Sequence, residues 1–394
     1  MDKRISDRLW VAIIAGGNGD RMFPIGTRAK PKQFCQMDED KTFIQAVAKT
    51  YLDYGVKPSQ IVITTTDDNQ ARLAAEQTLG LGILRRNIIQ VENYGYPAAM
   101  YFASEFISET HDPEAVVINT PSDQYVEAGL RFSKTIDEAV RGATQGEAVI
   151  VGVKINNLNI ATGCGHALFR YVRGARRYDV LGFVEKPNAK DAARIMKQDD
   201  SACNTGINVW KAETMLRAIR RHETKNLTTD RMMCRLGNLK VSVGSFKWYD
   251  CGTFQSLYDI GTKDSDGNVC LGGGTIGLKP GCCRSFFWAA GDLNLELYVD
   301  SAEDEAIVFN VVDNHPVFVD LKLCESQRMR ILAGNYYLHK TFLGRDFSSG
   351  ARNNLVSSND IDNLIVGFMG VDNRRVDVRR TQNGFKAFVK YDIC

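Results

Sequence analysis

The sequence predicts an α/β fold over its first two-thirds, followed by a smaller β-rich region. Short apolar, β-branched runs alternate in the first part with stretches of helical spacing, which favours a mainly parallel, Rossmann-like sheet with helices on both faces. After residue 262 the pattern changes to turn-rich segments and short β-type runs. The predicted domains are therefore residues 1–262 and 263–394.

Two sequence patterns predict the elements of the first domain: apolar, β-branched runs predict strands, and helical spacing of apolar residues predicts helices. The runs predicted to be strands, several of them apolar enough to be buried on both faces, are 10–15, 61–66, 87–91, 115–120 and 148–153. The stretches with helical spacing, which end near glycine or polar residues, are 42–55, 68–80, 97–109 and 130–143. Alternation of this kind places a ligand at the carboxyl ends of the strands.

The second domain has few helical patterns. Segment 262–282 is rich in turn residues, and it is followed by β-type runs at 295–299, 305–311 and 316–321. The last stretch alternates apolar and polar residues around Asn383 and Gly384, which predicts a hairpin. A short β-helix and a sandwich both fit these runs, with a role in assembly or regulation, including homo-oligomer formation.

Composition limits the classes of partner. A net charge of +2 over 394 residues gives no general attraction to nucleic acid or membranes. The chain has no continuous apolar run of about eighteen residues and no cleavage-site pattern near its start, so a soluble, cytoplasmic protein is expected. Ten cysteines without a CxxC pair favour a reduced chain.

A glycine-rich turn with a basic segment follows the first predicted strand, which ends near Ala15. The glycines that let the backbone turn and expose its amides are Gly16, Gly17 and Gly19. The basic residues that follow are Arg21, Arg28, Lys30 and Lys32. Exposed amides beside these cations suit a nucleoside triphosphate, although a β-to-α turn with a solvated basic face has the same composition. The dinucleotide motif GxGxxG fails at Met22, and no P-loop motif is present.

Two aspartates follow apolar runs. Asp123 comes just after run 115–120, and Asp250 comes just after the apolar residues of 241–248. Such a carboxylate pair suits Mg²⁺, with water and phosphate oxygens as the other ligands. Each aspartate alone could equally be a helix cap or a turn residue.

Six segments in order resemble the sugar-1-phosphate nucleotidyltransferases, and most closely their mannose-1-phosphate guanylyltransferase branch. They are AGGNGDRMFPIGTRAKPKQF (15–34), NTPSDQYV (119–126), ATGCGHA (161–167), GFVEKPN (182–188), NTGINVW (204–210) and WYDCGTFQSLYD (248–259). The resemblance implies a GT-A-like catalytic domain. It also implies that a sugar 1-phosphate, by preference mannose 1-phosphate, attacks the α-phosphate of a nucleoside triphosphate, by preference GTP, and releases pyrophosphate.

The resemblance also implies roles for single residues. Arg21 and Lys32 would be the catalytic cations, and Asp123 and Asp250 would hold Mg²⁺. The residues implied in nucleotide binding are Ala15, Gly16, Gly17, Gly19, Glu92 and Pro97. Those implied in binding the sugar phosphate are Gly163, Gly165, Glu185, Lys186 and Asn204.

Three departures from the family pattern leave alternatives open. Asp20 stands where the family has threonine, and Gln124 stands where it has histidine. Segment 92–100, ENYGYPAAM, does not have the consecutive arginine, asparagine and threonine that the family pattern places near the nucleotide base. The same reaction with another base or sugar is therefore an alternative, and so is a catalytically silent subunit that senses a nucleotide sugar.

Overall fold

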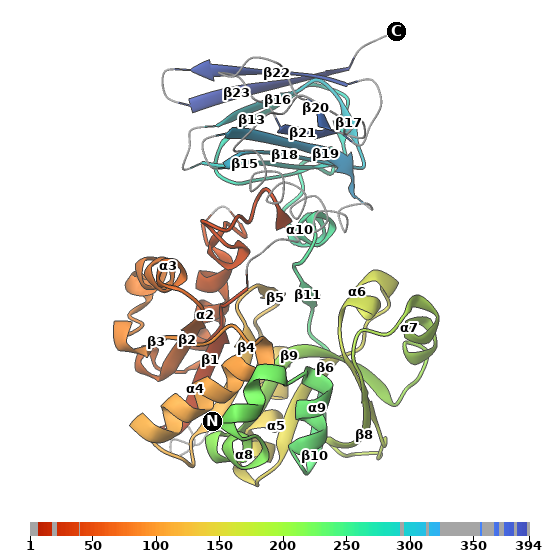
Figure 1. Cartoon of the computed structure of the whole chain (residues 1–394). Helices are drawn as coiled ribbons and strands as arrows, with labels where there is room; N and C mark the ends of the chain where they lie inside the picture. Colours follow the sequence, from red (N-terminus) through yellow and green to blue (C-terminus); the bar gives the residue numbers. More distant parts are fainter. Residues whose placement is uncertain are drawn as a thin grey trace. The chain divides into compact units, whose positions relative to one another are not determined.

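The computed structural model of the chain describes residues 7–17, 22–38, 40–291, 295–312, 315–323, 355–356, 366–369, 374–381 and 384–391 (Figure 1). The chain divides into two compact units: unit 1 is Met1–Gly16 with Ile44–Asp250, and unit 2 is Gly17–Phe43 with Cys251–Cys394. The units differ from the contiguous domains expected from the sequence, because segment 17–43 groups with the C-terminal part. The boundary at residue 262 stays a prediction.

Unit 1 is built on a nine-stranded sheet of order β3-β2-β1-β4-β9-β6-β10-β8-β7. Its first four strands are β1 (Leu9–Ile14), β2 (Ile61–Thr65), β3 (Ile88–Gln90) and β4 (Val116–Pro121). They all pair in parallel, with β1 between β2 and β4. This half of the sheet confirms the parallel pairing that the apolar runs predicted.

The other half of the sheet is mixed. Its strands are β6 (Ala148–Val153), β7 (His166–Phe169), β8 (Tyr178–Val184), β9 (Ser201–Lys211) and β10 (Leu239–Gly244). Strand β10 is parallel to β6, but β9 is antiparallel to both β4 and β6, and β7 and β8 form an antiparallel pair. The expectation of a mainly parallel sheet is therefore corrected. Burial on both faces, as in β9, marks a central strand but does not give its direction.

The four long helices lie within two residues of their predicted bounds: α2 (Phe43–Tyr54), α3 (Asp68–Thr78), α4 (Tyr96–Thr110) and α5 (Leu130–Thr144). The shorter helices are α6 (Leu158–Gly163), α7 (Ala189–Ile195), α8 (Ala212–Ala218) and α9 (Thr229–Arg235). Trp10 and Ala12 of β1 pack in one core cluster with Met100 of α4, while Val11 and Ile13 are equally buried and alternate to the other face of the sheet. Both faces of the sheet are therefore covered.

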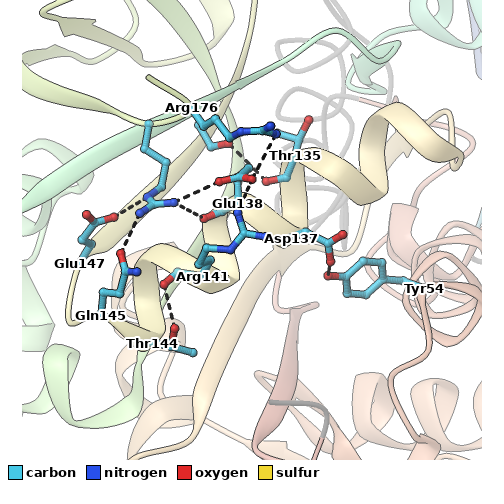
Figure 2. Close-up of polar contacts among 11 residues, drawn as sticks. Tyr54, Thr135, Asp137, Glu138, Arg141, Thr144, Gln145, Glu147 and Arg176 are labelled. Carbon is cyan, nitrogen blue, oxygen red and sulfur yellow. Dashed lines mark hydrogen bonds and ion pairs between the residues drawn. The ribbon is translucent and has the colours of Figure 1, made fainter. Parts of the chain in front are cut away.

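A partly buried ion-pair network connects α5 to the start of β8 (Figure 2). Glu138 of α5 is only 8% exposed and pairs with Arg141 at 2.6 Å, Arg177 at 3.2 Å and Arg176 at 3.5 Å. Arg177 also donates from Nε to Glu147 at 2.6 Å. The two arginines directly precede β8, so the network fixes the entry of this strand onto the sheet.

Unit 2 contains the short helix α10 (Phe254–Ile260) and two larger sets of strands. The first consists of β12 (Val269–Leu271), β15 (Phe286–Ala289), β18 (Glu305–Val312), β19 (His315–Lys322), β20 (Leu355–Val356) and β21 (Val366–Met369). The second consists of β13 (Thr275–Leu278), β16 (Glu296–Val299), β22 (Arg374–Thr381) and β23 (Gly384–Tyr391). A further pair is β14 (Cys282–Cys283) with β17 (Ala302–Glu303).

The pairing of these strands is that of a short parallel β-helix. Consecutive strands β12, β13 and β14 pair in parallel with β15, β16 and β17, and β15 pairs in turn with β18. Strand β22 pairs antiparallel with β23, as expected for the hairpin predicted around Asn383 and Gly384, although Asn383 itself lies outside the described residues. Of the two architectures that the sequence left open, the pairing is that of the β-helix.

Short segments of 3-10 helix are η2 (Lys32–Phe34), η3 (Pro58–Gln60), η4 (Leu79–Leu81), η5 (Arg85–Asn87) and η6 (Arg221–Asn226). In the part of the chain that the structure describes, no helix is both long and apolar enough to span a membrane.

Candidate active site

The carboxyl ends of β1 and β4 meet at the edge of the sheet where a ligand was predicted. The two strands pair from Leu9 and Val116 to Ile14 and Pro121. Just beyond them, the backbone N–H of Ser122 donates to the carbonyl oxygen of Ile14 at 3.1 Å. The next residue, Asp123, therefore lies close to the start of the glycine-rich turn.

Two residues of that turn belong to unit 1. The N–H of Ala15 donates to the carbonyl oxygen of Thr64 at 2.9 Å, which continues the β1–β2 pairing. A Cβ on Gly16 would lie 2.6 Å from Cγ2 of Thr66, so a larger residue here would force the Thr66 side chain to move.

Asp123 and Asp250 are brought together by a second, two-stranded sheet. Strands β5 (Gln124–Val126) and β11 (Trp248–Asp250) are antiparallel, and Asp250 lies directly opposite Gln124. Opposite Cα atoms in such a pair are about 4.5–5.5 Å apart and successive Cα atoms about 3.8 Å, so the Cα atoms of the two aspartates lie within about 9 Å. The aspartates singled out in the sequence are therefore neighbours in space, and Figure 1 shows this short pair apart from the main sheet.

Two carboxylates at this spacing fit a magnesium ion that is also bound by its substrate. Mg²⁺ in phosphate-handling sites commonly takes one or two carboxylates from the protein and fills its octahedron with phosphate oxygens and water. Among the residues that the structure describes, no group of three or more His, Cys, Asp or Glu side chains could hold a metal. The two carboxylates therefore fit a cation whose other ligands come from the substrate and water.

Three of the recognised sequence segments converge at the β7–β8–β9 end of the sheet. The N–H of Asn204 donates to the carbonyl oxygen of Gly165 at 2.8 Å, and the N–H of Lys186 donates to that of Cys164 at 3.2 Å. A side chain at Gly165 would collide with the ring of Phe183. The structure thus places predicted sugar-phosphate residues from three separate segments beside one another.

The side chains of this cluster have distinct surroundings. Lys186 has a φ of 44°, which few residues other than glycine adopt, and its Nζ lies 3.5 Å from the carboxylate of Glu185. The Oδ1 of Asn204 accepts from the N–H of Gly206 at 2.9 Å. Gly163 ends α6, and a Cβ there would meet no atom within 4 Å, so protein packing does not require that glycine.

Tyr96 is a residue that the sequence reasoning missed. Its hydroxyl donates to the carbonyl oxygen of Gly206 at 2.8 Å, which joins segment 92–100 to segment 204–210. Burial raises the pKa of Tyr96 well above its usual range, with further contributions from Tyr51 and from the negative charge of Asp123. Segment 92–100, in which the family pattern is altered, therefore lies close to Asp123. The only feature of the sequence that could have pointed to Tyr96 is its place in this altered segment, at the start of α4.

The two residues predicted in that segment lie on either side of Tyr96. Pro97 is buried in the first turn of α4. Glu92 is exposed, and a hydrogen bond to it raises the pKa of Tyr94.

A disulfide joins Cys164 to Cys203, with 6.4 Å between the two Cα atoms. The expectation of a fully reduced chain is corrected at this pair. The cysteines are 39 residues apart and belong to no CxxC motif. They meet because β7 pairs with β9, where His166 lies opposite Cys203.

The basic segment of the glycine-rich turn belongs to unit 2 and is held by local contacts. Nε2 of Gln33 donates to the carbonyl oxygen of Gly17 at 3.0 Å. Lys32 is only 2% exposed, and its Nζ lies 5.1 Å from the centre of the Phe43 ring. The solvated basic face that the sequence left open for this segment therefore does not extend to Lys32. Gly19, Asp20 and Arg21 lie outside the described residues.

The parallel order β3-β2-β1-β4, the glycine-rich turn after β1 and the carboxylate pair beyond β4 define an α/β protein of a nucleotide-binding type. The chain belongs to the nucleotidyl transferase family, whose model matches residues 11–267.

Sequence identity to individual relatives is low. The chain is 26% identical to a mannose-1-phosphate guanylyltransferase of Escherichia coli over 68% of its own length and 65% of the relative's. It is 24% identical to the enzyme of that name from Sinorhizobium fredii over 66% of its own length and 56% of the relative's. The matches thus span less than two-thirds of these relatives. A structure described as a mannose-1-phosphate geranyltransferase from Thermus thermophilus shares the fold, with a TM-score of 0.64, 18% identity and coverage of 84% of this chain and 99% of that one.

Proposed function

We propose that the protein condenses GTP with mannose 1-phosphate to give GDP-mannose and pyrophosphate. A phosphate oxygen of the sugar 1-phosphate attacks the α-phosphorus, the bond to the bridging oxygen of the β-phosphate breaks, and pyrophosphate leaves. The observation that carries the proposal is the register of β5 and β11, which sets Asp250 opposite Gln124 and so beside Asp123. Family membership and the names of the relatives support the same reaction.

In this proposal Asp123 and Asp250 hold Mg²⁺. When bound, the ion neutralises charge on the α-phosphate and orients it for in-line attack. The backbone amides from Ala15 to Gly19 bind triphosphate oxygens. Arg21 and Lys32 supply positive charge where negative charge develops, and a cation kept out of water is more effective in this role than an exposed one.

The sugar phosphate is proposed to bind at the convergence of the three segments at the β7–β8–β9 end. Lys186 meets the phosphate, while Glu185 and Asn204 bind sugar hydroxyls. The backbone bonds from Asn204 to Gly165 and from Lys186 to Cys164 hold these groups near one another. Glu92 and Pro97 remain the proposed contacts to the nucleotide.

One alternative keeps the reaction and changes the base or the sugar. The observation that favours it is Tyr96, which occupies the altered segment and bonds to Gly206 of the NTG segment. A bulky, partly buried ring in this segment would change the space available to the base or the sugar.

Pyrophosphate release tests the proposal. The purified chain is assayed with MgCl2 and four nucleoside triphosphates, each against mannose 1-phosphate and glucose 1-phosphate. We expect release with GTP and mannose 1-phosphate, and its loss in Asp123→Asn but not in the control Asp53→Asn, whose carboxylate is exposed and pairs with Lys49. Release with another pair alone would establish the alternative. Silence with every pair, while GDP-mannose still binds, would support the regulatory alternative instead.

A further inference from the structure

The geometry points to Gln124 as the positioning residue that sets the separation of Asp123 and Asp250. This inference rests on the proposed role of the two aspartates in binding the metal. Gln124 follows Asp123 in the chain and lies opposite Asp250 in the β5–β11 pair. Its side chain is buried, with 4% of the residue exposed.

Both ends of the Gln124 amide are used. Its Nε2 donates to Oγ1 of Thr120 at 2.8 Å, and its Oε1 accepts from Nε1 of Trp248 at 2.7 Å. Thr120 belongs to β4 in the main sheet, and Trp248 belongs to β11. One side chain therefore connects the main sheet to the strand that carries Asp250.

This connection matters because the β5–β11 pair is short. Each strand has three residues, and the pair forms a sheet of its own. An isolated two-stranded sheet is marginally stable in water. The pair is extended by a backbone bond from Glu127 to Lys247 at 3.0 Å and by the contact of the Tyr125 and Tyr249 rings, 6.1 Å apart. The side-chain hydrogen bonds of Gln124 tie this short pair to β4.

A primary amide suits this position chemically. The Trp248 indole can only donate, so Gln124 must offer it an acceptor, and the NH2 end of the amide is then available to donate to the Thr120 hydroxyl. A neutral histidine also offers one acceptor and one donor. A leucine of similar size offers neither and leaves the buried N–H of Trp248 without a partner, which favours separation of the strands.

The consequence is a link between Gln124 and metal affinity. Two carboxylates bind one cation well only at the correct separation, and groups that orient metal ligands commonly change affinity by about 10–100-fold when removed. Gln124 itself touches neither the metal nor the substrates in this proposal. Its loss should therefore weaken metal binding while the KM for mannose 1-phosphate stays the same.

The test measures Mn²⁺ as a magnetic probe for Mg²⁺, by electron paramagnetic resonance of MnCl2 titrated into the full chain with GDP-mannose present. Gln124→Leu should weaken Mn²⁺ binding about tenfold or more, and Gln124→His should keep it within about threefold. The control is Gln60→Leu. Gln60 is also buried, at 6% exposed, and its Nε2 donates to the carbonyl of Asp7 at 3.1 Å, at the opposite end of the sheet.

The outcomes separate the inference from the proposed function. If Asp123→Asn abolishes Mn²⁺ binding and folded Gln124→Leu binds as well as the unaltered chain, the positioning role is wrong and the metal site stands. If Asp123→Asn leaves Mn²⁺ binding unchanged, the metal site is wrong and the role of Gln124 falls with it. Should Gln124→Leu not fold, Trp248→Phe removes the same hydrogen bond while keeping an aromatic ring, and unchanged Mn²⁺ affinity in that variant overturns the inference.

Discussion

At the scale of single residues, Lys32 is a proposed catalytic cation whose side chain is buried. The residue is only 2% exposed, and its Nζ lies 5.1 Å from the centre of the Phe43 ring. Lysine side chains are rarely buried to this extent, which makes Lys32 a candidate for a role that needs its charge. The family resemblance implies that Lys32 fills this role by binding the triphosphate.

We predict that Lys32→Met lowers kcat by about 10²–10³-fold, because it removes one charge that stabilises the transition state and keeps the apolar stem packed. Pyrophosphate release under saturating substrates measures the effect, and thermal unfolding checks the fold. The matched control is Lys49→Met, since Lys49 pairs with Asp53 on an exposed face of α2. Similar kcat values in the two variants would remove Lys32 from the catalytic group.

Residues with a local sequence signature were the ones that could be predicted. Asp123 and Asp250 each follow an apolar run, and the structure brings their backbones together through β5 and β11. Tyr96 and the Cys164–Cys203 disulfide depend on pairing between distant segments. A tyrosine at a helix start or a cysteine without a CxxC partner carries no information about which distant backbone it will meet.

At the scale of elements, periodicity predicted the existence of strands and helices but not their direction. The five strands and four helices expected in the first domain are all present. The sequence identified segment 204–210 only as a family motif and did not predict a strand there. This segment lies in β9, which runs antiparallel between β4 and β6. Strand direction depends on how each connection crosses the sheet, and a strand buried on both faces has the same apolar pattern in either direction.

The ion-pair network between α5 and β8 gives a prediction at this scale. Glu138→Gln should lower the free energy of unfolding by about 2 kcal/mol, because it weakens partly buried charge-assisted bonds to Arg177 and Arg141. Urea unfolding followed by circular dichroism measures the change.

The control for that prediction is Glu76→Gln in α3. Glu76 pairs with Arg72 at 2.8 Å, but more than half of each side chain is exposed, so the expected loss is below about 0.5 kcal/mol. Equal losses in the two variants would mean that burial gives the Glu138 network no additional stability.

At the scale of the whole molecule, the chain does not divide at one point in the sequence. Segment 17–43, which contains Lys32, groups with residues 251–394. Within unit 2, Nδ2 of Asn310 donates to the carbonyl oxygen of Pro24 at 2.6 Å, and Gly273 packs closely against Gln36. A composition change near residue 262 cannot reveal such contacts, because they join segments more than two hundred residues apart.

This arrangement changes what truncation is expected to do. From the sequence alone, removing the β-rich region should alter assembly or solubility more than chemistry. In the structure, that region supplies Asn310, a buried partner of the segment that contains Lys32. We therefore predict that a chain ending at residue 262 loses pyrophosphate release even when it is folded and soluble.

A point substitution tests the same coupling without removing any chain. Asn310→Ala removes the bond to Pro24 and should loosen segment 17–43, so the KM for the nucleoside triphosphate should rise about fivefold or more, as expected for loss of about 1 kcal/mol of stabilisation. The KM for the sugar 1-phosphate should change little, because its proposed residues all belong to unit 1.

The control for this substitution is Arg284→Ala, which removes exposed ion pairs to Glu303 and Asp304 within unit 2. Equal changes in both KM values for Asn310→Ala would indicate a general loss of stability. No change in either KM would show that the bond from Asn310 does not position segment 17–43 for nucleotide binding.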